Sequence, residues 1–369
     1  MKPQTMPLFN LNNIPKECKI TFIIGNGFDL GLGMKTKFAD VYDGYVNSPN
    51  SSETIARFKA ELKRNSDNNY EKWSDFEMGM ASYAQALETE NELVECIRDF
   101  KSYMVEHLQN ENQKMIDLLK SITNTFGIIQ ELNRSFENFY DGLTQNDISS
   151  LKYIMQKGKA VRNYITFNYT TILEELLALK FNHYHVIENQ PIHIHGKLGS
   201  DIVMGIDNDE QLIQTKFSLT RKGRRAFVKT RFNDEFDGDR VEATQKMISE
   251  SSIICVYGFS MGESDETWVK AISNWLLSDD NHHLVVYQYD TPKCNPCNYD
   301  EIMEIEDDRK ELLLNRLGIN NDAILDQIHI PVGRDIFNFS FKEILPHTLK
   351  ESSNFDPMKT YESKSFVMN

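Results

Sequence analysis

The sequence predicts an α/β fold in which helices cover both faces of a mostly parallel sheet. Short runs that are apolar on both faces recur along the chain, among them "KITFII" at 19–24, "NYITF" at 163–167 and "SIICVY" at 252–257. Helical patterns such as "TTILEELLALKF" separate several of these runs. Because strands that are buried on both faces and alternate with helices are typical of parallel sheets, the expected architecture is Rossmann-like.

Further strands are predicted at 183–187, 191–195 and 283–289. The block from about 50 to 155, which follows the first strand, contains almost no glycine or proline and carries apolar residues at helical spacing. We expect this block to be a large helical insertion that stands outside the sheet.

The composition is that of an ordinary globular protein, with a hydrophobic fraction of 40% and a charged fraction of 26%. We interpret residues 1–350 as a single α/β domain that carries the insertion. The last segment, "ESSNFDPMKTYESKSFVMN" at 351–369, is polar and predicts a flexible tail.

The charge balance argues against nucleic acid as a partner. The chain has 40 basic and 55 acidic side chains and a formal net charge of -15, so bulk electrostatics oppose binding to a phosphate backbone. No stretch approaches the roughly 20 apolar residues of a membrane helix, and the N-terminal segment has no apolar core long enough for a signal peptide. We expect a cytoplasmic protein that binds neither a membrane nor duplex nucleic acid.

The five cysteines are scattered and odd in number, which argues against a disulfide framework. Cys294 and Cys297 form one "CNPC" motif, typical of a redox site or of half a zinc site. The chain offers no second pair, and His183, His185 and His193 lie about a hundred residues upstream. We interpret the motif as a loop with two thiols and expect no metal.

A glycine-rich stretch, "GNGFDLGLG", directly follows the first predicted strand. A strand that ends in Gly25-Asn26-Gly27 and leads into a helix presents bare backbone N–H groups that a phosphate can approach. The dinucleotide fingerprint is incomplete, because Leu30 stands where its third glycine would be. The stretch therefore indicates either a nucleotide site or a tight strand-to-helix turn without a ligand.

Asn168 directly follows a predicted strand, and His195 is the last residue of another. Taken singly, Asn168 fits a turn or N-cap residue and His195 fits a core histidine. Ligands of open α/β sheets bind outside the carboxyl ends of the strands, so we expect both residues to converge there with Gly25. His193, two residues before His195, is interpreted as structural.

Residues 258–262 read "GFSMG" and fit the G-x-S-x-G pattern of a serine-hydrolase elbow. In an elbow the helix begins at the serine, whereas "GESD" intervenes here, with Ser264 or Asp265 as the expected N-cap. We therefore interpret Ser260 as a residue that binds a ribose or a phosphate.

Taken in order, the motifs of the chain resemble those of the bacteriophage abortive-infection family AbiH. They are "IIGNGFDLGLGMKTKFADVY", "KWSDFE", "ITFNYTTILEEL", "IHIHGKL" followed by "MGID", and "VYGFSMGESD". The same order is similar to that of sirtuins and sirtuin-like NADases. The sirtuin first loop usually reads Gly-Ala-Gly, unlike the loop here, and the four-cysteine zinc module of sirtuin deacylases is absent. The resemblance therefore favours NAD cleavage over deacylation.

The resemblance implies an anti-phage effector that hydrolyses NAD, its substrate, to nicotinamide and ADP-ribose. His195 would act as the base towards a ribose hydroxyl or water, and Asn168 would position the water and the ribose. The other implied ligand-binding residues are Gly25, Asn26 and Gly27 at the pyrophosphate, Asp29 near the ribose or nicotinamide, and Gly258 with Ser260 at the adenosine. The expected protein partner is a phage-derived trigger or a partner defence protein, and a homo-oligomer of the chain is a further possibility.

Two other functions fit the same residues. One is a nucleotide-binding sensor that acts through a partner, and the other is a serine hydrolase that uses Ser260. Release of nicotinamide from NAD by the purified protein would distinguish the NADase from both.

Two further segments have open roles. Trp73, Asp75 and Glu77 match an AbiH motif, and we favour a role in anchoring the insertion over a catalytic one. The basic segment "RKGRRAFVKTR" at 221–231 is interpreted as a solvated loop, with contact to nucleotide phosphates or to a phage nucleic acid as the alternative.

Overall fold

The computed structural model describes residues 17–68, 76–156, 158–179, 186–212, 215–288, 295, 298–333 and 335–339. Outside these ranges lie the segment 351–369 and Trp73, Asp75, His183, His185, Cys294 and Cys297. What the sequence predicts for these residues stays a prediction.

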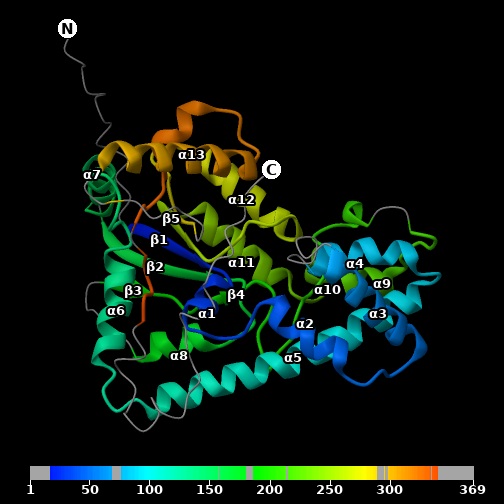
Figure 1. The fold of residues 1–369 in the computed structure, drawn as a ribbon. Coiled ribbons are helices and arrows are strands. Elements are labelled where there is room, and N and C mark those ends of the chain that lie inside the picture. The colour runs from blue at the N-terminus through cyan, green and yellow to red at the C-terminus, as the bar shows by residue number, and fades with distance from the viewer. Residues whose placement is uncertain are drawn as a thin grey trace.

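A parallel sheet forms the centre of the fold, which confirms the predicted α/β class (Figure 1). Its strands are β1 (Glu17–Ile24), β2 (Lys159–Thr166), β3 (Val186–Glu188), β4 (Ile192–His193), β5 (Ile253–Tyr257), β6 (His283–Tyr287) and β7 (Ile328–His329). The order is β3-β2-β1-β5-β6-β7, with β4 also paired to β2, and every pair is parallel. The two-residue β7 is too short for the sequence pattern to predict.

Helices account for most of the remaining described chain. They are α1 (Gly27–Gly31), α2 (Phe38–Asn47), α3 (Glu53–Asn68), α4 (Phe76–Tyr83), α5 (Glu90–Ser121), α6 (Phe126–Glu137), α7 (Gln145–Met155), α8 (Ile172–Leu179), α9 (Arg221–Phe227), α10 (Lys229–Phe236), α11 (Gly238–Ser249), α12 (Glu266–Leu276) and α13 (Tyr299–Leu317). None of the helices in the described part of the chain has both the length and the apolar character that a membrane span requires.

The strand order reverses between β1 and β5. From β1, the sheet extends through β2 and β3 on one side and through β5, β6 and β7 on the other. The register places the last residues of three strands, Ile24, Thr166 and Tyr257, side by side. The loops after β1, β2 and β5 therefore begin at one edge, next to the reversal point, where open parallel sheets bind their ligands.

Apolar cores lie on both faces of the sheet. On one face, the rings of Phe22 and Tyr164 pack against Phe136 of α6, with centroids 4.9 and 5.2 Å away, in a core shared with α7 and α8. On the other face, Ile23 and Ile254 belong to a core with α12 and α13. Successive residues of β1 thus point to opposite faces, and both are buried, which explains the continuous apolar run in the sequence.

The helical insertion divides into two parts. Its described residues contain no strand, as predicted. Helices α2 to α4 and the first half of α5 form a third core together with α9, whereas α6 and α7 cover the sheet. The 32-residue helix α5 contributes Phe100 to the third core and Met115 to the core on the sheet. Figure 1 shows α5 running along the bottom of the view from one group of helices to the other.

The loops after β1 and β5 touch through their backbones. The Gly25 N–H donates to the Tyr257 carbonyl and the Gly27 N–H donates to the Gly258 carbonyl, each at 2.9 Å. A Cβ on Gly25 would lie 2.4 Å from the Gly258 carbonyl oxygen, and one on Gly258 would lie 2.6 Å from Gly27 Cα. The glycines at the end of the first apolar run therefore allow two loops to meet at the reversal point.

Alanine at Gly258 is expected to destabilise the fold more than alanine at Gly318. Both glycines have a φ of +67°, so both variants carry the cost of a left-handed alanine, roughly 1–2 kcal/mol. A Cβ on Gly318 meets nothing within 4 Å, whereas overpacking should add roughly 1–3 kcal/mol at Gly258. Urea unfolding of the two variants measures the difference, and equal losses of stability would contradict the packing role of Gly258.

Candidate functional site

A cavity of about 830 Å³ lies at the carboxyl edge of the sheet. It is lined by all the site residues that the sequence predicts: Gly25, Asn26, Gly27, Asp29, Asn168, His195, Gly258 and Ser260. Helix α2 and the helical insertion contribute an apolar part of the wall that includes Phe38, Phe76, Phe100, Met104 and Leu108. The structure thus brings the predicted residues together at the reversal point of the strand order.

The turn from Gly25 to Gly27 lines the cavity, but its polar groups are largely bonded within the protein. The N–H groups of Gly25 and Gly27 donate to carbonyls at the end of β5 and in the loop after it, so the prediction of bare N–H groups is wrong for both. The Asn26 side chain donates to the Thr36 carbonyl at 3.0 Å and accepts from Thr36 Oγ1 at 2.6 Å. The glycines of this turn therefore serve close packing, and the turn shapes the cavity wall.

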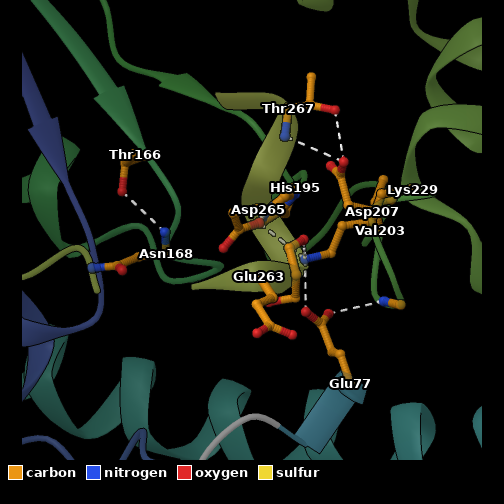
Figure 2. A network of polar contacts seen from close by, with 12 residues as sticks. Glu77, Thr166, Asn168, His195, Val203, Asp207, Lys229, Glu263, Asp265 and Thr267 are labelled. Carbon is orange, nitrogen blue, oxygen red and sulfur yellow. Dashed lines mark hydrogen bonds and ion pairs between the residues drawn. The ribbon is translucent and has the colours of Figure 1, made fainter. Parts of the chain in front are cut away.

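Asn168 is buried in the wall between β2 and α8. Its N–H donates to Thr166 Oγ1 at 3.1 Å (Figure 2). Its carbonyl oxygen lies 2.8 Å from His193 Nδ1. His193 Nε2 also contacts Glu174 at 2.7 Å, in keeping with its expected structural role. Helix α8 begins only at Ile172, so Asn168 is not its N-cap. Asn168 Oδ1 is buried without a hydrogen-bond partner among the described residues.

Asp29 of α1 is only 2% exposed and lines the same cavity. Its Oδ2 accepts from Thr170 Oγ1 at 2.7 Å, whereas Oδ1 is buried and finds no partner in the described ranges. Burial raises the pKa of Asp29 to about 7, although the hydrogen bond from Thr170 and the nearby Asn168 side chain act in the opposite direction. Near neutral pH the carboxyl group can therefore hold a proton, and its unpaired oxygen can then donate a hydrogen bond.

His195 follows β4, and its ring pairs with Asp265, for which the sequence suggests only a capping role. His195 Nε2 lies 2.8 Å from Asp265 Oδ1. Because an ionised carboxylate only accepts, Nε2 carries the hydrogen and Nδ1 of the neutral ring is unprotonated. Nδ1 is buried, with no partner in the part of the chain that the structure describes. A histidine that a carboxylate orients, with its second nitrogen unpaired, has the arrangement of a general base.

Lys229, the first residue of α10, joins this pair to the helical insertion. Its Nζ lies 3.0 Å from Asp265 Oδ1 and 2.6 Å from Glu77 Oε2. Glu77, on α4, also accepts from the Gly205 N–H at 2.9 Å. Figure 2 shows these contacts as a continuous chain, with Glu77 on α4 at the lower edge of the view. We refer to Glu77, Lys229 and Asp265 as the ion-pair cluster.

Burial and the charges of the ion-pair cluster together set the protonation of His195. Burial, followed by the charge of Lys229, lowers the pKa of His195 below its ordinary value, against the opposite effect of Asp265. Burial acts to raise the pKa of Asp265, but the charge of Lys229 and the contact with His195 outweigh it and hold that pKa below its ordinary value. At neutral pH, His195 is therefore a neutral imidazole and Asp265 an anion.

Sequence reasoning missed Asp265 and Lys229 as site residues. Asp265 does stand at the N-cap of α12, but its side chain makes no capping hydrogen bond and contacts His195 instead. Lys229 is one of many basic residues in its segment, and the signal that could have singled it out is its place directly after the apolar pair Phe227 and Val228. Glu77 holds α4 against other elements, in keeping with the anchoring role that we favoured.

The basic segment at 221–231 is not a loop, because it forms α9 and the start of α10. Arg221 pairs with Glu235 at 2.8 Å, and Arg224 and Arg231 each pair with Asp209 at 3.1 Å. Acidic neighbours thus neutralise much of its positive charge. The segment therefore presents less net positive charge to a phosphate backbone than its composition suggests.

Ser260 lines the cavity from an exposed position in the loop after β5. In a nucleophile elbow the serine occupies a strained turn at the start of a helix. Here the positive φ, 54°, belongs to Met261, and α12 begins only at Glu266. These features favour ligand binding by Ser260 over a role as nucleophile.

The cysteines take no part in the site as described. Cys18, Cys96 and Cys255 are buried, and burial raises the pKa of Cys255. Within the described ranges, no three His, Cys, Asp or Glu side chains are arranged to hold a metal ion.

Replacement of Lys229 by methionine should destabilise the protein by roughly 3–5 kcal/mol, because it leaves two buried carboxylates without a counter-charge. Lys222→Met is the matched control, since Lys222 belongs to the same basic segment but is exposed; it should change stability by less than about 0.5 kcal/mol. Urea unfolding at pH 8 compares the two. Equal stability of the two variants would show that the buried charge of Lys229 is dispensable.

Asp29→Asn should stabilise the protein by an amount that grows between pH 5 and pH 8. An aspartate whose pKa rises from 3.8 to about 7 on folding contributes stability that is complete below pH 3.8 and is lost as the pH rises through 7. A rise of about 3 units corresponds to at most roughly 4 kcal/mol for the ionised side chain. Asparagine keeps an acceptor for Thr170 without this cost. Urea unfolding at both pH values measures the gain, and a gain independent of pH would contradict the raised pKa.

Comparison with known families agrees with this geometry. The family described as "Bacteriophage abortive infection AbiH" matches residues 21–287. This span runs from β1 to the last residue of β6, so it includes the strands whose ends form the cavity. No curated protein matches the chain. Because the family match covers well over half of the sequence, the chain belongs to the AbiH family of bacteriophage abortive-infection proteins.

Proposed function

We propose that this AbiH protein acts in abortive infection by hydrolysing NAD to nicotinamide and ADP-ribose. The observation that carries the proposal is a set of three buried polar atoms, Asp29 Oδ1, Asn168 Oδ1 and His195 Nδ1, that lack hydrogen-bond partners among the described residues. The three residues line one cavity. Since a buried polar atom without a partner costs free energy, a ligand or a water molecule is expected to bond to them.

The place and size of the cavity favour a nucleotide. Dinucleotides bind where the strand order of a parallel sheet reverses, and this is where the cavity lies. Its volume of about 830 Å³ falls within the range of roughly 300–1,000 Å³ for small-molecule and cofactor sites. The turn from Gly25 to Gly27 would lie beside the pyrophosphate, and Gly258 with the exposed Ser260 would meet the adenosine.

Hydrolysis of NAD gives each of the three residues with an unpaired atom a place in the reaction. Cleavage of the bond between nicotinamide and ribose leaves the electron pair on the nicotinamide nitrogen and a cation on the ribose, which water must reach. His195 Nδ1 would take a proton from that water, and Asp265 would stabilise the resulting imidazolium. Asn168 Oδ1 would accept a hydrogen bond from the water or from a ribose hydroxyl. Asp29 would lie at the nicotinamide end.

NAD cleavage accounts for abortive infection, because a cell depleted of NAD cannot support phage growth. A phage-derived trigger or a partner defence protein would then set the time of activation. The second candidate is a nucleotide sensor that binds in the same cavity without turnover, and it rests on the same unpaired atoms.

His195→Gln should lower nicotinamide release from NAD at least about 100-fold, because it removes the base. Glutamine is preferable to alanine, since His195 is buried and an amide can still donate to Asp265. Asn168→Ala should have a comparable effect. Chromatographic assay of nicotinamide after incubation of the purified protein with NAD measures both.

His282→Gln is the matched control, because His282 stacks on Trp275 and does not line the cavity. It should release nicotinamide at the wild-type rate. Because the pKa of His195 is lowered, the wild-type rate should decline only below about pH 6.5. Folded His195→Gln with wild-type activity would reject the assignment, and wild-type protein that binds NAD without releasing nicotinamide would be a sensor.

A further inference from the structure

The two carboxylate oxygens of Asp265 have different surroundings. Oδ1 accepts from His195 Nε2 at 2.8 Å and from Lys229 Nζ at 3.0 Å, whereas no described residue donates to Oδ2. The Asp265 side chain is 15% exposed, compared with 6% for His195 and 4% for Lys229. Asp265 also lines the cavity. Besides His195 Nδ1, the unpaired oxygen of Asp265 is therefore a part of this pair that a bound ligand can meet directly.

Helix capping does not explain this aspartate. Asp265 stands at the N-cap of α12 but makes no capping hydrogen bond. The carboxylate that caps the first turn is Asp207, whose Oδ2 accepts from the Thr267 N–H at 3.2 Å and from Thr267 Oγ1 at 2.8 Å. Figure 2 shows Asp207 on Thr267 and Asp265 turned towards His195. A second carboxylate thus performs the capping, which leaves Asp265 available to the cavity.

The ion-pair cluster keeps Asp265 negatively charged. Two carboxylates share one ammonium group, and burial raises the pKa of Glu77 to about 7 in spite of Lys229. The pKa of Asp265 is held below its ordinary value by Lys229 and His195, against the effect of burial. A proton that enters the cluster near neutral pH therefore goes to Glu77, and Asp265, which lines the cavity, stays anionic.

An anionic oxygen beside a neutral histidine suits a cation better than a phosphate, because opposite charges attract strongly where water is excluded. The reaction proposed above creates such a cation. When the bond between C1′ of the ribose and the nicotinamide nitrogen breaks, the electron pair stays on nitrogen and the positive charge is shared by C1′ and the ring oxygen. A fixed carboxylate that meets this charge lowers the barrier.

We propose that Asp265 is a catalytic residue whose Oδ2 stabilises the ribosyl cation formed from NAD, an inference that rests on the proposed NAD cleavage. Nicotinamide leaves as a neutral molecule. The oxygen of a water molecule forms the new bond to C1′, its proton passes to His195 Nδ1 and then to solvent, and the products are ADP-ribose and nicotinamide. Asp265 is unchanged at the end of the cycle.

The test compares two ligands that differ in charge at the ribose. One is ADP-ribose, and the other is an ADP-ribose analogue whose terminal ribose is replaced by a protonated pyrrolidine. Calorimetry should show that the wild type binds the cationic analogue at least about 10-fold more tightly. Asp265→Asn keeps an acceptor for Lys229 and His195 but removes the charge. It should lose this preference, bind ADP-ribose within about 3-fold of wild type, and lower kcat roughly 100- to 1,000-fold.

Asp207→Asn is the matched control, a carboxylate-to-amide change at the same helix end but outside the cavity, and it should keep the preference. Equal binding of the two ligands by wild type, or a preference that survives in Asp265→Asn, would overturn the role of Asp265. If Asp265→Asn does not fold, the Glu77→Gln/Lys229→Met/Asp265→Asn triple variant removes all three charges of the ion-pair cluster together and should show the same loss. Wild-type protein that binds neither ligand would refute the NAD site itself.

Discussion

The buried ammonium group of Lys229 is the interaction on which the site depends. Its side chain is only 4% exposed, and an unpaired charge at such a position would cost several kcal/mol. Glu77 and Asp265 compensate it, one from α4 and the other from the residues before α12, while Lys229 itself begins α10. Three segments far apart in the sequence are thereby fixed relative to one another, and the orientation of His195 follows from the position of Asp265.

The sheet and the edge where the cavity lies could be predicted from the sequence. Strands β1, β2 and β5 are buried on both faces, so each leaves a continuous apolar run that local pattern detects. Residues that follow such strands collect at one edge of a parallel sheet whatever the strand order. Gly25, Asn168 and His195 could therefore be placed together before the order was known.

The ion-pair cluster could not be predicted in this way. Lys229 is 152 residues from Glu77 and 36 from Asp265, and a charged residue has the same local pattern whether it is solvated or buried with a partner. The turn from Gly25 to Gly27 shows a similar limit, because a glycine N–H that is open to a phosphate and one that is bonded to another loop leave the same letters in the sequence. In both cases, the pairing of Lys229 and the bonding of the glycine N–H groups, the outcome depends on contacts between segments far apart in the sequence.

Helix α5 joins the helical insertion to the sheet layer mechanically. Its 32 residues extend over about 48 Å, with one half in the core of the insertion and the other half in the core on the sheet. The two cores cannot swing apart as hinged bodies unless this helix bends or breaks its backbone hydrogen bonds. Any force that acts on the insertion is therefore transmitted along α5 to the core on the sheet.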